Sequence, residues 1–318
     1  MKTFNRDDLH TFVKHSNINE QAVKTALEQH IYPQKKDWQK FLQIFFITLG
    51  IGFTVAGIIF FFAYNWNHLH KFVKIGLILG LVIVTTLFSI YGTKKTVLQQ
   101  LLMVGAFFLV GVLFAVFGQI YQTGANAYDF FLAWTVFTTL WVFNSNFSPL
   151  WLCYFSVMHT TVFLYAQQVA TNWPNEFVYL ILFVLSVITF VLMYVYASKN
   201  TNNSIHNWLL QTIALAATVY ATFGMVIAIF QKYEFLFFIF LFLVAMVYYL
   251  GFWLSNKLKN IYYQAIIFFS LIVIITAFLL EISDGEGMFL FIFLFIIFSI
   301  TMVIRRLVEL QKQWSHES

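Results

Sequence analysis

The sequence predicts an all-α protein that crosses a membrane as a polytopic helical bundle of about ten spans. Composition is the first reason, because 61% of the residues are hydrophobic and 10% are charged, whereas soluble domains average about 45–50% apolar and about 25% charged residues. The second reason is that the apolar residues gather in long uncharged runs. The third is that the basic residues fall mainly on one side of these runs. Membrane lipid is therefore the expected partner of the protein surface.

The apolar runs define the expected helices. A hydrocarbon core of about 30 Å requires about 20 apolar residues in an α-helix, and lipid offers no hydrogen bonds to an unfolded backbone. The fourth run is the shortest, because Asp129 caps it and only about 15 clearly apolar residues follow, and it is expected to be tilted, short or partly re-entrant. The runs are 41–64, 72–92, 97–120, 128–143, 149–168, 177–197, 208–230, 235–254, 261–280 and 288–304.

The basic residues indicate the orientation of the chain. With the N-terminus in the cytoplasm, 15 of the 18 Lys and Arg residues fall on the cytoplasmic side, where short loops of membrane proteins carry such an excess. The other three are Lys71, Lys74 and Lys232. Both termini are therefore expected in the cytoplasm. The basic pI of about 9.1 is explained by this topology and by attraction to the cytoplasmic leaflet, so nucleic acid is not an expected partner.

Three parts of the chain are expected. Residues 1–40 form a short cytosolic helical hairpin and the entry segment, residues 41–304 form the transmembrane helical bundle, and residues 305–318 form a cytosolic tail. In the hairpin, Leu9, Phe12 and Val13 lie on one helical face. A segment of about 40 residues rarely folds alone. The hairpin is therefore expected to dock on the membrane domain or on a cytosolic protein partner.

Glycines in the first three runs favour close helix packing. Gly76 and Gly80 stand in a G-x-x-x-G pattern, which lets helix backbones approach closely in lipid. Packing within one chain is the favoured interpretation, and a homodimer face is the alternative. The glycines expected to pack are Gly57, Gly76, Gly80, Gly105, Gly111 and Gly118.

A group of polar side chains is expected at the outer membrane face. Amide groups pair with hydroxyl-rich or carboxylate ligands, and aromatic rings stack on sugars or apolar faces. These residues are the candidate ligand-binding site, and the alternative is that they only cap helix ends at the interface. The group consists of Asn65, Trp66, Gln119, Tyr121, Gln122, Asn126 and Asp129.

Few residues suggest catalysis or metal binding. His159 is the only histidine within an expected span, and it is expected as a neutral imidazole that is hydrogen-bonded to a neighbouring helix, with proton transfer as the alternative. His68 and His70 lack further ligands, so no metal is expected. The chain contains no G-x-S-x-G, H-E-x-x-H or P-loop motif. A non-catalytic protein without a cofactor is therefore favoured, and enzyme activity is left open.

Three segments resemble a known family. They are SNINEQAVKTAL near the N-terminus, the first span ending in FAYNW, and GQIYQTGANAYDFFLAW across the third and fourth spans. Over roughly residues 1–170 the chain is similar to the bacterial predicted membrane proteins grouped as domain of unknown function 2157. The resemblance implies a multi-pass protein of the bacterial inner (cytoplasmic) membrane, and it implies no reaction, substrate or cofactor.

Two functions remain after this comparison. The favoured one is a permease-like protein for a small solute or a lipid-related molecule, because ten spans and an outer polar group suit such a bundle. The alternative is a non-catalytic membrane sensor or an assembly or scaffold protein that acts through the N-terminal hairpin.

Overall fold

The described part of the chain is entirely helical in its regular structure. In the computed structural model these residues form ten α-helices and no strand, which confirms the predicted all-α bundle. Most of the predicted segment 1–40 falls outside the described residues, and positions 35–40 belong to the first helix. The described residues are 21, 32, 34–64, 69–92, 96–121, 124, 126–145, 147–199, 206–231, 235–283 and 287–316.

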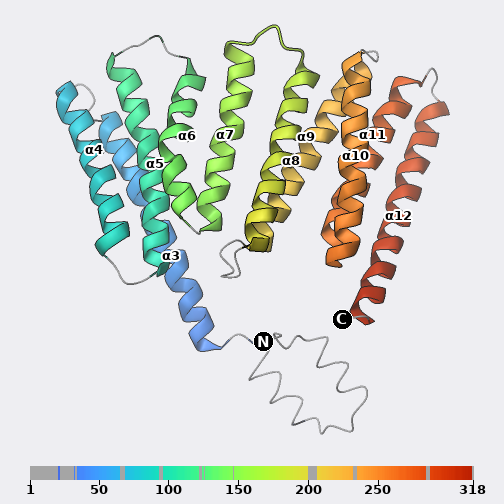
Figure 1. The fold of residues 1–318 in the computed structure, drawn as a ribbon, viewed down its shortest axis with the longest axis horizontal. Helices are drawn as coiled ribbons and strands as arrows, with labels where there is room; N and C mark the ends of the chain where they lie inside the picture. Colours follow the sequence, from blue (N-terminus) through green and yellow to red (C-terminus); the bar gives the residue numbers. More distant parts are fainter. Residues whose placement is uncertain are drawn as a thin grey trace. The chain divides into compact units, whose positions relative to one another are not determined.

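Each predicted apolar run corresponds to one helix. The short π-helical segment η1 (Phe88–Gly92) follows directly after α4. The last helix extends past its apolar run, so residues 305–316, expected as a tail, continue it as helix. The helices are α3 (Lys35–Tyr64), α4 (Lys71–Leu87), α5 (Thr96–Tyr121), α6 (Ala127–Asn144), α7 (Ser148–Gln168), α8 (Asn175–Lys199), α9 (Asn207–Phe230), α10 (Phe235–Leu258), α11 (Ile261–Glu281) and α12 (Gly287–His316) (Figure 1).

The chain forms two compact units, residues 1–113 and residues 114–318. The first unit contains α3, α4 and most of α5. Within it, Phe107 and Ile78 are fully buried. The Ser89 hydroxyl in η1 donates a hydrogen bond of 2.7 Å to the Gln99 carbonyl oxygen in α5. This bond ties the π-helical end of α4 to the next helix.

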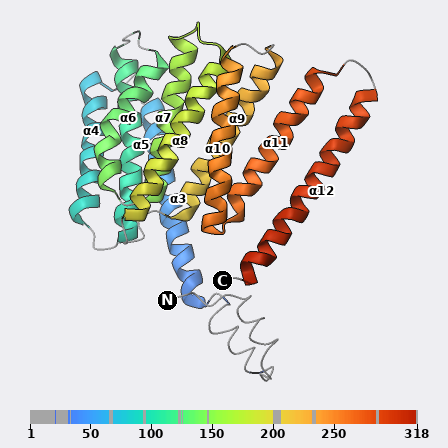
Figure 2. The ribbon, with the colours of Figure 1, turned by 45° about the vertical axis from the view of Figure 1, so that its right-hand side comes forward.

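The second unit contains helices α6 to α12, which run up and down in sequence order (Figure 1). Its core lies where α9 packs against α8, α10 and α11 (Figure 2). Phe183, Met225 and Phe240 are almost fully buried there. Gly224 lets α9 approach its neighbours, because a Cβ at this position would collide with the Phe240 ring and lie 2.8 Å from the Tyr179 Cβ. Small residues allow such close approach between membrane helices.

Eight of the described helices are long and apolar enough to cross a membrane by length and composition. Helices α6 and α7 are not among these eight. Both carry several hydroxyl side chains, which lower their mean hydropathy. Most of these hydroxyls bond a carbonyl one turn back in the same helix, as Thr138 and Thr160 do at 2.7 and 2.8 Å. Two bonds also join the helices, Thr135 to Thr161 at 3.3 Å and Thr139 to the Tyr154 hydroxyl at 3.0 Å.

Candidate functional site

The predicted outer polar group is described in part. Asn65, Trp66 and Gln122 lie outside the described residues. Gln119 and Tyr121 lie in the last turn of α5, and both side chains are exposed. The Tyr121 ring packs against Phe117 with centroids 4.6 Å apart. The proposed convergence of the seven residues on one site therefore stays a prediction.

The structure shows how Asn126 and Asp129 interact. Asn126 precedes α6, and its backbone N–H donates a hydrogen bond of 3.0 Å to the Asp129 carboxylate. The two residues form a capping box at the positive end of α6, where a carboxylate is stabilised by the unpaired N–H groups of the first turn. In the same turn, the backbone N–H of Tyr128 donates to the Gln168 side-chain oxygen at 3.0 Å. The carboxylate of Asp129 thus has a structural role at this helix start.

The glycines expected to pack differ in their surroundings. A Cβ at Gly105 would lie 3.1 Å from Ile51 Cγ2, so α3 and α5 approach closely at this point. A Cβ at Gly57, Gly76 or Gly80 would meet no atom within 4 Å. The same is true of Gly118 in the second unit. A packing or dimer role for these four residues stays a prediction, as it does for Gly111.

A buried carboxylate lies at the start of α8. Glu176 is only 3% exposed. Gln231 lies at the end of α9. With its side-chain amide oriented to satisfy both groups, the Gln231 nitrogen donates hydrogen bonds to both Glu176 carboxylate oxygens, and its distance to Oε1 is 2.9 Å. This pairing compensates for the cost of burying the acidic group and joins the ends of the two helices.

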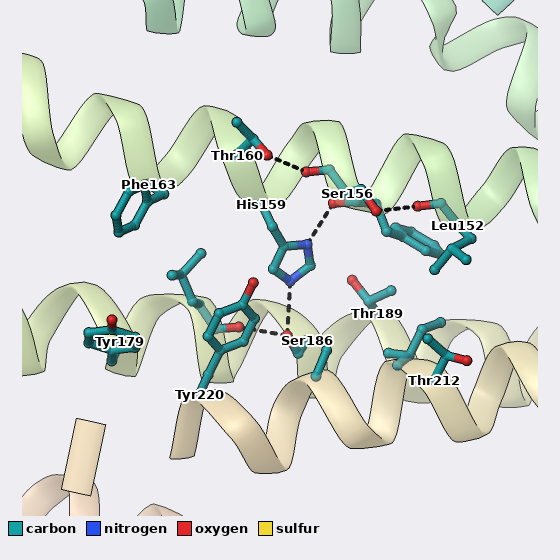
Figure 3. A pocket seen from close by; sticks show the side chains of 14 residues that line it. Leu152, Ser156, His159, Thr160, Phe163, Tyr179, Ser186, Thr189, Thr212 and Tyr220 are labelled. Carbon is teal, nitrogen blue, oxygen red and sulfur yellow. Dashed lines mark hydrogen bonds between the residues drawn. The ribbon is translucent and has the colours of Figure 1, made fainter. Parts of the chain in front are cut away.

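The second unit contains a cavity of about 380 Å³ between α7, α8 and α9. Its volume falls in the range of about 300–1,000 Å³ that is usual for small-molecule sites. His159, Ser186 and Ala216 lie near the middle of their helices, so the cavity is at mid-depth in the bundle. None of its described lining residues is Asp, Glu, Lys or Arg. The lining residues are Leu152, Phe155, Ser156, His159, Thr160, Phe163, Tyr179, Leu182, Ser186, Thr189, Thr212, Ile213, Ala216 and Tyr220 (Figure 3).

His159 lies at the centre of this cavity and bridges two helices. Its Nδ1 atom lies 2.7 Å from the Phe155 carbonyl oxygen in α7, and its Nε2 atom lies 2.9 Å from the Ser186 Oγ in α8 (Figure 3). The Tyr220 ring of α9 stacks on the imidazole, with centroids 5.6 Å apart and an interplanar angle of 8°. The bond to Ser186 confirms the predicted hydrogen bond from His159 to a neighbouring helix.

The bonding partners of His159 determine where its protons lie. A carbonyl oxygen only accepts hydrogen bonds, so Nδ1 carries a proton. The Ser186 hydroxyl also lies 2.8 Å from the Leu182 carbonyl oxygen. If the imidazole is neutral, Nε2 accepts and the Ser186 proton must point to it. If the imidazole is charged, Nε2 donates and the Ser186 proton points to Leu182. In both states the protons of the pair are used within the protein, so the Ser186 oxygen presents a lone pair as an acceptor to a bound molecule.

Hydroxyl groups give the rest of the cavity its polar character. Thr160 and Ser156 come from α7, while Thr189 and Thr212 come from α8 and α9 (Figure 3). Thr212 donates to the Trp208 carbonyl oxygen at 2.9 Å, and the lone pairs of its oxygen remain acceptors. Among the described residues, no three His, Cys, Asp or Glu side chains are grouped as metal ligands. The site chemistry is therefore that of hydroxyl groups and one histidine beside aromatic rings.

The N-terminal half of the chain matches a known family. Residues 10–151 match the model of a family described as predicted membrane protein, DUF2157. This segment is similar to the proteins of the DUF2157 family. The resemblance found in the sequence is thereby confirmed. The comparisons with curated proteins and with solved structures gave no match.

One candidate site lies inside the DUF2157 segment and the other lies outside it. The whole outer polar group lies within residues 10–151, whereas the cavity around His159 is lined from Leu152 onward. The family description and the eight apolar helices together establish a multi-pass membrane protein. The sequence pattern indicated His159 as a polar group within a span. It did not indicate the cavity, because the lining residues come from three helices and share no local motif.

Proposed function

We propose that this protein is a permease-like membrane protein in which the cavity around His159 binds a small, neutral, hydroxyl-bearing solute. The observation that carries the proposal is a polar cavity at mid-depth between three helices, since transporters bind substrates near the bilayer midplane. The absence of charged residues among its described lining residues favours a neutral solute. The oxygens of the hydroxyl groups and of the His159–Ser186 pair supply hydrogen-bond acceptors for solute hydroxyls.

Aromatic rings support the same substrate class. Tyr220 lines the cavity with its ring stacked on His159, and Tyr179 lies beside it with centroids 6.5 Å apart. Ring faces of this kind pack against the apolar faces of polyols and sugars, while the neighbouring hydroxyls bind their oxygens. A cavity of about 380 Å³ accommodates a solute of monosaccharide size or smaller.

We also propose that the outer polar group binds the solute at the outer membrane face. Gln119 and Tyr121 support this role, because their exposed side chains are available to a solute. Asp129 is less available, because it caps α6. The residues proposed for this ligand-binding role are Asn65, Trp66, Gln119, Tyr121, Gln122, Asn126 and Asp129.

For the whole chain we propose ten spans in a bacterial inner membrane with both termini in the cytoplasm. The segregation of basic residues supports the orientation. It does not distinguish ten spans from eight, because removing the adjacent pair α6 and α7 leaves every other loop on its original side. The self-bonded hydroxyls of α6 and α7 favour ten, since a satisfied hydroxyl is less costly in lipid. Helix α7, with 21 residues, spans about 31 Å.

Solute flux into proteoliposomes tests the proposal. We expect the purified protein to raise the uptake of at least one of glycerol, glucose and myo-inositol above that of protein-free liposomes. His159→Phe should reduce this uptake at least tenfold, because the ring fills the cavity and removes both hydrogen bonds. Thr276→Val is the matched control, because the Thr276 hydroxyl bonds only the Ile272 carbonyl oxygen in its own helix and lies outside the cavity. Uptake of none of the three solutes, or equal uptake by both variants, would refute the proposal.

A further inference from the structure

A second cavity, of about 300 Å³, lies between α8, α9, α10 and α11. Its lining is almost entirely apolar, and it contrasts with the hydroxyl-rich cavity around His159. Ala214 of α9 lines the apolar cavity. Ala216, two residues further along the same helix, lines the polar cavity around His159. The lining residues on α8 extend from Phe183 to Tyr194, a length of about 16 Å along the helix. The shape and chemistry of this space suit an extended hydrocarbon chain.

One end of the apolar cavity has the character of a membrane interface. Trp253 and Tyr263 line it near the end of α10 and the start of α11, and Tyr194 lines it near the end of α8. Tryptophan and tyrosine are enriched where hydrocarbon meets headgroups. The other end, at Phe183 and Tyr248, lies near the middle of the helices. The cavity thus runs from an interface toward the bilayer centre, as a lipid tail does.

A positive charge lies at the interfacial end. The Lys257 Nζ lies 5.0 Å from the centroid of the Trp253 ring, and Trp253 lines the cavity. Lys257 is exposed, so its ammonium group is accessible to a headgroup at the membrane surface. Because Lys257 lies against a tryptophan that lines the cavity, its ammonium group can pair with the phosphate of a phospholipid whose acyl chain occupies the cavity.

We propose that this cavity binds one acyl chain of an anionic phospholipid whose phosphate group pairs with Lys257. A phospholipid is the proposed occupant because the site combines an apolar cavity of chain length, an aromatic interface and a basic residue. A free fatty acid would also fill the cavity, and a zwitterionic phospholipid would fill it without the charge preference. The experiment separates these ligands.

Native mass spectrometry of the protein released from nanodiscs tests the proposal. The nanodiscs contain equal amounts of phosphatidylglycerol and phosphatidylcholine with the same acyl chains. We expect one retained phospholipid per chain and about a fivefold preference for phosphatidylglycerol, the size of effect that one basic residue has on anionic lipid. Equal retention of both lipids, or retention of free fatty acid in place of phospholipid, would overturn the proposal.

Two variants and two matched controls identify the site. Ala214→Phe fills the apolar cavity and should abolish lipid retention, whereas Ala216→Phe projects into the polar cavity and should leave it unchanged. Lys257→Glu, at an exposed position, should remove the preference for phosphatidylglycerol, whereas Lys312→Glu on α12 should keep it. An unchanged preference in Lys257→Glu would overturn the headgroup assignment, even if Ala214→Phe failed to fold.

Discussion

Gly224 offers the sharpest test of how the second unit is packed. In Gly224→Ala the new methyl group would collide with the Phe240 ring and lie 2.8 Å from the Tyr179 Cβ. Phe240 is 0% exposed and packs on Phe183 with ring centroids 5.8 Å apart, so it has little room to move. Overpacking of this kind costs about 1–3 kcal/mol. The gain from replacing glycine in a helix is about 0.5–1 kcal/mol, so we expect a net loss of about 1–2 kcal/mol.

Thermal unfolding of the purified protein in detergent measures this loss. For a unit of this size, 1–2 kcal/mol corresponds to a melting temperature lower by about 2–8 °C. Gly80→Ala is the matched control, because an added Cβ there meets no atom within 4 Å. The control should melt at the wild-type temperature or slightly above it. A Gly224→Ala variant as stable as the control would show that α8, α9 and α10 are not packed as described.

Two further predictions concern polar contacts and topology. The Ser270 hydroxyl forms hydrogen bonds with the Thr222 hydroxyl at 2.6 Å and with the buried Tyr248 hydroxyl at 2.5 Å. Ser270→Ala should therefore lower the free energy of unfolding by about 1–2 kcal/mol. A decrease below about 0.5 kcal/mol in a denaturant titration would argue against these hydrogen bonds. In single-cysteine variants, an impermeant reagent should label Gly124→Cys from outside and Phe147→Cys only from the cytoplasm; outside labelling of Phe147→Cys would reject the ten-span topology.

The helices were predictable because each is built on a long apolar run that lipid requires to be helical. Their ends were less predictable. Helix α12 continues past its run to His316, and α3 begins at Lys35, because charged residues extend a helix readily once it leaves the hydrocarbon. The π-helical end of α4 has no signal in the sequence. The bond from Ser89 to the Gln99 carbonyl that accompanies it depends on a neighbouring helix.

The residues of the candidate sites could also be predicted from the sequence, but their contacts could not. The polar character of Asp129 was visible in the sequence, but its use as a helix cap depends on backbone geometry at Asn126. His159 was visible as a polar group in a span, whereas its partner Ser186 lies 27 positions away and depends on the register between α7 and α8. Gly224 stands in no G-x-x-x-G pattern, so its close contact with Phe240 could not be inferred before the helices were placed.

The most direct test of the account is whether water-soluble molecules reach the cavity around His159. Ala216 lines this cavity, and the adjacent Leu215 is 43% exposed outside it at the same depth. Each is replaced by cysteine in a Cys153→Ala background and treated with a charged, membrane-impermeant methanethiosulfonate. Only a thiolate in water reacts rapidly. The account predicts that Ala216→Cys is modified at least tenfold faster than Leu215→Cys, and equal rates or no reaction at either position would contradict it.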